Sequence, residues 1–459
     1  MQLKVNNFRS FDNEEFDFSR INIFIGENSG GKSSLLKFLL ALKQTIDSPN
    51  ESNFKLRGDL TDLGNYKEVV RNKEENRKLE FGFSAKEEYI EYYVNFIEKY
   101  FQKRTNDDEI KIALKVLNLL EDEIKTSIYF TLNSTLNNHN TITTEISNNK
   151  IGTIILESER NESDNTLITK ILYDLKIHTG CINDCIAYKE GFFTLLEWDL
   201  KKTIVEMNPE EGLEIYYKML FLLYFQNFCL NYIELISFVN PIGTIPKRFY
   251  FQEDKKASYK LIDIEKIINI LGDPSLSEKD LGKILEYLNN SIRKLGIADE
   301  LNISKNEDTP VVSLNVKTKG FWSNITDVGY GVSLQIPILF QAILSENYTE
   351  NGEILLIEQP EVHLHPSLQS RFIETLIDIG EKNKYFIETH SEHIIRKLQI
   401  MVKKNENNLK PEDVSIYYFK RTTEKFEVTK HTIDSEGKLN PIFPSGFYDN
   451  SYTLVKELL

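Results

Sequence analysis

The hydrophobic positions near the start of the chain repeat in two different ways. Apolar and polar residues alternate over MQLKVNNF at 1–8, whereas INIFI at 21–25 is a short apolar run broken only by Asn22. Alternation is typical of a half-buried strand, and a short apolar run is typical of a fully buried one. The segment LLKFLLALKQTI at 35–46 then places apolar residues at helical spacing. These patterns predict strand, turn, strand, loop and helix, with the turn at 12–13, and KLEFGFS at 78–84 adds a strand.

The later part of the chain alternates between the two patterns. IDIEKIINIL and KDLGKILEYLNNSIRKLGI have helical spacing, and VVSLNVKT reads as a strand. Apolar strands and amphipathic helices then take turns in ILLIE, SLQSRFIETLIDIGEK, KYFIET, EHIIRKLQIMVKK and VSIYYFK. Strands separated by helices usually pair in parallel. The pattern therefore predicts an α/β fold with a parallel sheet.

The middle of the chain has a different amino-acid composition. The Asn-rich NSTLNNHNTITTEISNNKIG predicts exposed loops and hairpins, and IYYKMLFLLYF predicts a long helix. The most apolar stretch, 219–239, is interrupted by Gln226, Asn227, Asn231 and Glu234. This stretch is therefore expected to be a buried or interface helix rather than a membrane span.

These changes in hydrophobic pattern and composition divide the chain into three expected parts. At 459 residues it is longer than a single core usually supports. We expect an N-terminal lobe at 1–84 and a C-terminal lobe at 239–459. The α+β insertion between them, at 85–238, is expected to serve as a lid or as a surface for partners or oligomerisation.

Composition narrows the classes of protein. The formal net charge of −15 repels nucleic acid on average, so a DNA contact would need a local basic face or a partner. The three cysteines, Cys181, Cys185 and Cys229, are too few for a disulfide framework. The first residues lack the basic flank and apolar core of a secretion signal. A cytoplasmic protein is therefore expected.

The strongest chemical signal is GENSGGKSS, which runs from Gly26 to Ser34 between an apolar strand and a helix. It matches the phosphate-binding loop G-x-x-x-x-G-K-[ST], in which backbone N–H groups and the helix N-terminus face the phosphates. Lys32 would contact the terminal phosphates, and the Ser33 hydroxyl would ligate Mg²⁺. The competing interpretation is a glycine-rich turn that only joins strand to helix. The candidate nucleotide contacts here are Gly26, Asn28, Gly30, Gly31, Lys32, Ser33 and Ser34.

A second signal lies in ILLIEQPE, where four apolar residues are followed by acids. Glu358 is expected at the carboxyl end of a buried strand, beside the phosphate loop, where it could hold Mg²⁺. Glu361 is a second carboxylate that could assist the metal or a water molecule. Taken alone, the segment could equally be a buried strand with an acidic exit turn.

Two further segments could contact phosphate. ETHSEH follows another apolar strand and offers His390, and DVGYGVSLQIPIL places Gly331 just before Ser333 and an apolar helix. An ordinary capped helix and a structural histidine remain open as alternatives. The spacing of His363, His365, His390 and His393 does not match common zinc sites, and His178 with Cys181 and Cys185 reads as part of a core.

Together, GENSGGKSS, GYGVSLQIP, IEQPEVHLHPSLQ and ETHSEHII resemble the ABC-type ATPase core shared by SMC-like proteins, RecF and OLD-family ATPases. The likeness is greatest to stand-alone ATPases of the OLD-like branch, including ATPase subunits of bacterial anti-phage systems, and FPSGFYDNSYTLVKELL resembles the ending of one subgroup. The resemblance covers the first 84 residues and roughly the last 200. It implies an ABC-type head, which is a P-loop α/β fold with a mixed sheet flanked by helices, and it leaves the insertion unassigned.

The resemblance also implies roles for particular residues. Lys32 and Ser33 would contact phosphate and Mg²⁺, and Glu358 would be the Walker B acid. Gly331 and Ser333 would read the γ-phosphate bound to the opposite copy in an ATP-bridged homodimer or higher oligomer. His390 would be the switch histidine, and Arg9, in NFRS, would lie near the nucleotide.

The sequence departs from the family pattern in two respects. The usual base after the Walker B acid is replaced by the amide Gln359, which cannot accept a proton. We therefore expect slow hydrolysis, with Glu361 or His390 as the residual catalytic group beside Glu358 and Gln359. The sequence also lacks a Toprim-like acidic cluster after the ATPase motifs, which implies a separately encoded effector.

Three functions compete. The leading hypothesis is a slow ATPase that controls a separate effector, a nuclease, in phage defence, triggered by DNA or a phage product, without a membrane. The alternative is a RecF- or SMC-like repair ATPase that clamps DNA directly. The third is a self-contained nuclease that uses acidic runs of the insertion, Glu87–Glu88, Asp107–Glu109 or Glu121–Glu123, although such runs are usually solvated.

Overall fold

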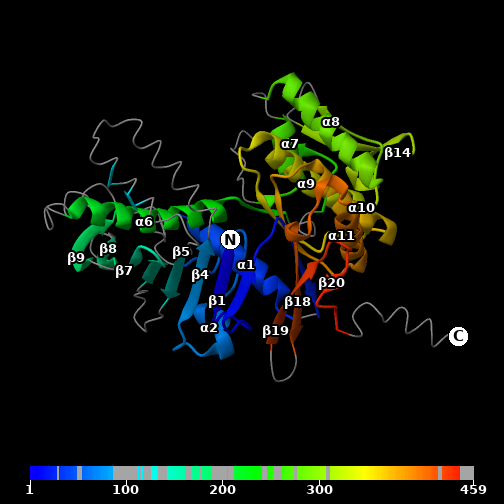
Figure 1. Cartoon of the computed structure of the whole chain (residues 1–459). Coiled ribbons are helices and arrows are strands. Elements are labelled where there is room, and N and C mark those ends of the chain that lie inside the picture. The colour runs from blue at the N-terminus through cyan, green and yellow to red at the C-terminus, as the bar shows by residue number, and fades with distance from the viewer. Residues whose placement is uncertain are drawn as a thin grey trace. The chain divides into compact units, whose positions relative to one another are not determined.

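The chain folds into two compact units. The structure, a computed structural model, describes residues 1–27, 30–48, 54–85, 111–112, 115–116, 126–132, 142–160, 167–175, 178–187, 204, 211–239, 245–251, 261–272, 276–305, 311–421 and 426–444. Unit 1 comprises Met1–Phe18 and Lys37–Glu234, and unit 2 comprises Ser19–Leu36 and Leu235–Leu459 (Figure 1). These bounds differ from the three expected parts, which remain a prediction about domains.

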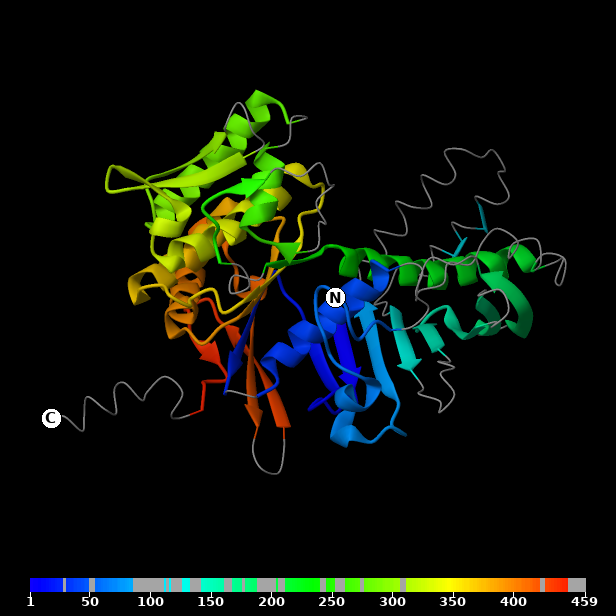
Figure 2. The ribbon, with the colours of Figure 1, turned by 180° about the vertical axis from the view of Figure 1, so that it is seen from behind.

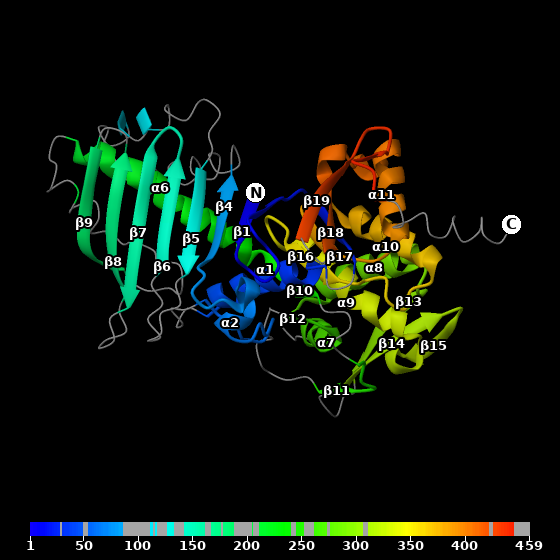
Figure 3. The same cartoon turned by 90° about the horizontal axis from the view of Figure 1, so that it is seen from below.

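Unit 1 is built on an eight-stranded antiparallel sheet, whose strands lie side by side in Figure 3. In spatial order the strands are β2 (Glu14–Asp17), β1 (Gln2–Asn6), β4 (Leu79–Ala85), β5 (Thr126–Leu132), β6 (Ile142–Asn148), β7 (Gly152–Arg160), β8 (Leu167–Leu175) and β9 (His178–Ala187). The strands predicted at 1–8 and 78–84 are confirmed as β1 and β4. The insertion contributes a larger sheet than its Asn-rich loops suggested.

Helix α6 (Gly212–Glu234) lies along this sheet, against β5, β6 and β7 (Figure 3). The predicted long helix is confirmed, but it ends at Glu234, and Ile236–Val239 form strand β10 instead. The β-branched residues of ISFV favour a strand there. Lys218 on α6 is buried and pairs with Glu214 at 2.8 Å. No helix in the described ranges combines the length and apolar character that crossing a membrane requires.

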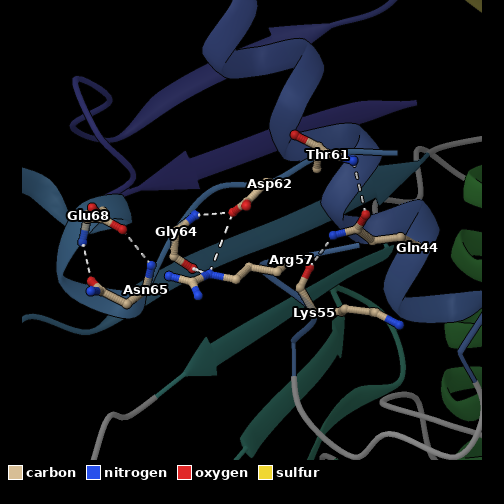
Figure 4. Close-up of polar contacts among 8 residues, drawn as sticks. All are labelled: Gln44, Lys55, Arg57, Thr61, Asp62, Gly64, Asn65 and Glu68. Carbon is tan, nitrogen blue, oxygen red and sulfur yellow. Dashed lines mark hydrogen bonds and ion pairs between the residues drawn. The ribbon is translucent and has the colours of Figure 1, made fainter. Parts of the chain in front are cut away.

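Helix α1 (Lys32–Ile46) supplies aromatic and polar contacts to unit 1 through its second half. The Phe38 ring packs edge-on against Phe81, with ring centroids 5.4 Å apart. Gln44 holds the following loop, since its side chain donates to the Lys55 carbonyl at 2.7 Å (Figure 4). The loop leads to the short helix α2 (Tyr66–Val69), which begins in a capping box.

Unit 2 contains the predicted mixed sheet. Its order is β12 (Leu261–Ile262), β10, β16 (Ile354–Glu358), β17 (Lys384–Glu388), β3 (Ile21–Gly26), β18 (Val414–Arg421), β19 (Phe426–Ile433) and β20 (Leu439–Asn440). The first six strands are parallel, and the last two pairings are antiparallel. Strand β17 therefore separates the phosphate-loop strand β3 from β16, which carries Glu358.

Five longer helices accompany this sheet (Figures 1 and 2). They are α7 (Ile264–Gly272), α8 (Glu278–Leu295), α9 (Tyr330–Tyr348), α10 (Pro366–Ile379) and α11 (Glu392–Lys404). A smaller antiparallel sheet joins β11 (Tyr250–Phe251), β14 (Val311–Thr318) and β13 (Glu300–Lys305), and β15 (Phe321–Asn324) also pairs with β14. The fold is the expected α/β head, and its core lies where the fully buried β3 and the buried residues Ile354–Ile357 of β16 meet these helices.

Candidate functional site

The predicted site residues of unit 2 come from the carboxyl ends of β3, β16 and β17, together with the start of α9. Parallel strands end at one edge of a sheet, so their terminal side chains gather there. Asn28 lies outside the described residues. Arg9 belongs to unit 1, where its N–H donates to the Val69 carbonyl at 2.6 Å and its guanidinium lies over the Phe8 ring. Its role toward a nucleotide stays a prediction.

The loop after β3 is shaped by its glycines. Gly26 has φ 144°, and a methyl group on it would lie 2.0 Å from the Phe419 carbonyl oxygen of β18. A methyl group on Gly30 would lie 2.8 Å from the Glu27 carbonyl oxygen, and Gly31 has φ 98°. Only glycine fits such a close approach at positive φ. The backbone therefore turns tightly into α1 and brings Lys32, Ser33 and Ser34 into its first turn.

Gly26→Ala should destabilise the protein by about 2 kcal/mol or more, because the added methyl would overlap β18 at a strained φ. Gly282→Ala is the matched control: Gly282 lies inside α8 with nothing within 4 Å of the added methyl. The control should gain about 0.5–1 kcal/mol from helix propensity. Urea unfolding of both variants measures the difference, and equal stabilities would contradict this account of the loop.

Lys32 is folded onto the loop itself. Its ammonium donates to the Gly26 carbonyl at 3.0 Å and to the Glu27 carbonyl at 2.8 Å, and the residue is 4% exposed. Burial lowers the pKa of Lys32, against the opposing effect of Glu388 and Glu27. In this arrangement two carbonyl oxygens of the loop accept hydrogen bonds from the ammonium, and a phosphate could take their place.

Ser33 contacts a carboxylate that the sequence interpretation did not select. Its hydroxyl donates to Glu388 Oε1 at 2.9 Å, and Glu388 is 3% exposed. Burial raises the pKa of Glu388, with further increases from Glu358 and Glu361, while Ser33 and Lys32 oppose the shift. The sequence did contain a signal for Glu388. In IETH, as in IEQP, a glutamate directly follows an apolar run at the end of a strand.

Glu358 ends β16 in register with Glu388 on β17, so the two residues lie side by side on neighbouring strands. The adjoining Gln359 has φ 45°, and its N–H donates to the Glu388 carbonyl at 2.7 Å. A left-handed residue reverses the chain direction at the strand end. The resulting turn returns Glu361 toward β17.

Glu361 and His390 meet through a backbone contact. The His390 N–H donates to Glu361 Oε1 at 2.6 Å. Burial raises the pKa of Glu361, although hydrogen bonds to its carboxylate oppose the shift. Burial and the positive charge of Lys32 lower the pKa of His390. The site thus holds a carboxylate and an imidazole whose pKa values are displaced toward each other, as in many proton-transfer sites.

The raised pKa of Glu361 has a consequence for stability. A carboxyl group whose folded pKa exceeds its unfolded value of 4.5 contributes stability that is complete below pH 4.5 and is lost as pH rises through the folded pKa. Glu361→Gln should therefore flatten the fall in unfolding free energy from pH 4.5 upward. Urea unfolding at a series of pH values measures the slope, and an unchanged slope would contradict the burial of this charge.

The start of α9 packs on the turn that follows β16. Gly331 leaves no room for a side chain, because a methyl there would lie 2.6 Å from the His363 carbonyl oxygen. The buried Gln335 amide donates to the Pro360 carbonyl at 2.7 Å. Ser333 is 2% exposed and its hydroxyl donates to the Tyr330 carbonyl at 2.8 Å. The sequence suggested that the Ser333 hydroxyl is available to bind phosphate. In this structure the hydroxyl instead donates its hydrogen bond to a carbonyl of α9 itself.

The donor set of the edge fits Mg²⁺. This ion prefers oxygen ligands and is usually held by one or two carboxylates with phosphate oxygens and water. Ser33 offers a hydroxyl, and Glu358 and Glu388 offer carboxylates. Among the residues that the structure describes, no group of three or more His, Cys, Asp or Glu side chains is arranged to hold a metal ion.

Known protein families match most of the chain. The family described as AAA ATPase domain matches residues 1–395, and one described as Protein of unknown function (DUF3696) matches residues 409–458. No curated protein matches this chain.

Solved structures of SMC heads resemble the chain with low identity. An SmcHead bound to the C-winged helix domain of ScpA is 11% identical over 94% of this chain and 97% of that chain, with a TM-score of 0.42. The SMC head domain from Thermotoga maritima is 10% identical over 93% and 97%, with a TM-score of 0.35. An Smc head domain with an extended coiled coil, bound to the C-terminal domain of ScpA derived from Pyrococcus furiosus, is 9% identical over 100% and 98%, with a TM-score of 0.37.

The AAA ATPase domain match includes the phosphate loop, the start of α9 and the carboxyl ends of β16 and β17. It spans well over half of the chain. The chain therefore belongs to the AAA ATPase domain family and is an ATPase, whose unit 2 carries a mixed sheet accompanied by helices.

Proposed function

We propose that this ATPase is a slow, ATP-gated switch of the OLD-like branch that controls a separately encoded nuclease in bacterial phage defence. The observation that carries the switch is the gathering of Lys32, Ser33, Glu361 and His390 at one edge of the unit 2 sheet. The defence role rests on the resemblance of the motif set, which includes GENSGGKSS and IEQPEVHLHP. The protein would act in the cytoplasm, and DNA or a phage product would trigger it.

ATP would bind at the loop between β3 and α1. The N–H groups of this loop and the N-terminus of α1 face an anion favourably, and Lys32 would exchange the Gly26 and Glu27 carbonyls for phosphate oxygens. Ser33 and Glu358 would hold Mg²⁺. When bound, the ion would neutralise phosphate charge and polarise the terminal phosphoryl group.

Hydrolysis needs a group that takes a proton from the attacking water. Gln359 can orient water through its amide but cannot accept a proton. Glu361 is the better base, because burial raises its pKa toward neutrality while the His390 N–H keeps its orientation. A base supplied by the turn, rather than by the residue after Glu358, is consistent with a long-lived ATP-bound state.

Two copies would enclose the nucleotide between the phosphate loop of one and the α9 start of the other. Gly331 and Ser333 would then face the γ-phosphate across the interface. The Ser333 hydroxyl would first have to give up the hydrogen bond that it donates to the Tyr330 carbonyl. In this proposal the ATP-bridged assembly, a homodimer or larger oligomer, is the form that binds the effector.

Affinity purification from cells of the source bacterium tests the proposal, with unmodified and Lys32→Ala proteins compared by mass spectrometry. We expect one nuclease to co-purify only with the unmodified protein. Absence of an ATP-dependent partner would contradict control of a separate effector. Retention of duplex DNA by purified protein with ATP would favour the DNA-clamp alternative, and cleavage of DNA without a partner would favour a self-contained nuclease.

A further inference from the structure

We propose that Glu388, at the carboxyl end of β17, is a metal-site carboxylate that anchors Ser33 and holds the Mg²⁺ accompanying ATP. The inference rests on the proposed binding of Mg²⁺ and ATP at this edge, and it adds a residue to that site. Glu358 was the acid expected to fill this position. The strand order, the burial of Glu388 and the local balance of charge all support the additional carboxylate.

The strand order favours Glu388. Strand β17 is hydrogen-bonded directly to β3, which leads into the phosphate loop, whereas β16 lies one strand further away. Adjacent strands are about 4.8 Å apart, so Glu358 starts one strand spacing further from the loop. The contact follows this order, since Ser33 donates to Glu388 Oε1 at 2.9 Å.

The second oxygen of Glu388 needs a partner. Glu388 Oε2 is buried and has no hydrogen-bond partner among the described residues. A buried carboxylate oxygen without a partner is costly and uncommon, and such groups are usually satisfied by protein, water or an ion. An oxygen next to a metal-binding hydroxyl would gain a partner when a cation or its water ligand arrives.

The local charge points to a divalent cation. Glu388 lies in register with Glu358, and like charges on neighbouring strands repel. The nearby cation, Lys32, is held by the Gly26 and Glu27 carbonyls. Around Glu388, the like charges of Glu358 and Glu361 are opposed by that of Lys32, so negative charge is in excess there. Mg²⁺ would offset this excess, and its preference for carboxylate oxygen matches the groups present.

Metal binding to the protein–nucleotide complex tests this role without relying on turnover. The probe is Mn²⁺, followed by electron paramagnetic resonance in the presence of a non-hydrolysable ATP analogue. Glu388→Gln should lower Mn²⁺ affinity by about 10–100-fold, the usual range for groups that support a metal. Binding of the analogue in EDTA, measured by calorimetry, should change by less than about 3-fold, because Lys32 and the loop remain.

Glu353→Gln is the matched control. Glu353 accepts a hydrogen bond from the Ser237 hydroxyl at 2.6 Å, which resembles the Ser33–Glu388 pair, but it lies at the opposite end of β16. It should leave Mn²⁺ affinity unchanged. If Glu388→Gln binds Mn²⁺ as tightly as Glu353→Gln does, the inference is overturned.

Two further comparisons keep the outcomes distinct. If the unmodified protein fails to bind the analogue with or without metal, the proposed nucleotide site fails; normal analogue binding with an unaffected Glu388→Gln variant overturns only the metal role. The glutamine keeps the shape of the side chain, and it removes one of two like charges, so the variant should melt no lower than the unmodified protein. Should it melt lower, Glu388→Asp keeps the charge and decides the question: Mn²⁺ affinity restored toward that of the unmodified protein supports the metal role, and affinity as low as in Glu388→Gln would overturn the inference.

Discussion

Lys32→Ala should lower the affinity for ATP by about 30- to 4000-fold. Lys32 is the buried cation of the phosphate loop, and its ammonium already lies between two carbonyl oxygens at hydrogen-bonding distance. Truncating one partner of a buried, charged hydrogen bond typically costs about 2–5 kcal/mol, and each 1.4 kcal/mol is a factor of ten in affinity. Isothermal titration of ATP into each protein measures the loss.

Lys37→Ala is the control for this prediction, because Lys37 lies just over one turn further along α1 and is only partly buried. The control should bind ATP as the unmodified protein does. Thermal melting confirms that both variants are folded. Tight ATP binding by a folded Lys32→Ala protein would show that the loop does not hold the nucleotide.

Glu361→Gln should lower the rate of ATP turnover by about 10²–10⁴-fold, the usual contribution of a positioned general base. ATP affinity should be little changed, since the substitution leaves Lys32 and Ser33 in place. For the unmodified enzyme we expect the rate to rise with pH as the Glu361 carboxyl, whose pKa burial raises, loses its proton. Single-turnover measurements separate this chemical step from product release.

Glu374→Gln provides the control, because Glu374 is an acid on α10 that pairs with Lys397 at 3.1 Å, away from the strand ends. It should leave turnover unchanged. Rapid turnover that survives Glu361→Gln would mean that another group accepts the proton. Gln359→Glu would then identify whether the usual base position is still competent.

The sequence was sufficient to predict the elements around the phosphate loop. Strand β3, helix α1 and strands β16 and β17 lie in short segments whose apolar pattern is unambiguous. The contact between Ser33 and Glu388 could not be predicted in this way, because it depends on β17 pairing with β3 across more than 350 positions of the chain. Strand order is set by packing of the whole sheet, which periodicity does not encode.

Two other differences also have non-local causes. The sequence predicted hairpins in the Asn-rich segment but not the full extent of strands β5 to β9, because their Thr- and Asn-containing segments become strands only when paired in one long sheet. The Ser333 hydroxyl was expected to be available, but α9 is buried nearly all round, so the hydroxyl finds its acceptor within the helix. Burial on all sides is a property of the assembled unit rather than of the segment.

Glu388, which ends β17, and the two residues that follow it contact α1, β3 and the turn after β16. Glu388 holds the Ser33 hydroxyl and receives the Gln359 N–H, the Thr389 N–H donates to the Phe24 carbonyl of β3, and the His390 N–H holds Glu361. Entry of a nucleotide that shifts the phosphate loop would therefore pull on the catalytic turn through one short peptide. Through this peptide, the binding of ATP at the phosphate loop would change the position of Glu361. The number of residues between Glu388 and His390 would therefore be as important as their identity. Inserting a single glycine after Thr389 would keep all of these side chains but would uncouple the position of Glu361 from the binding of ATP.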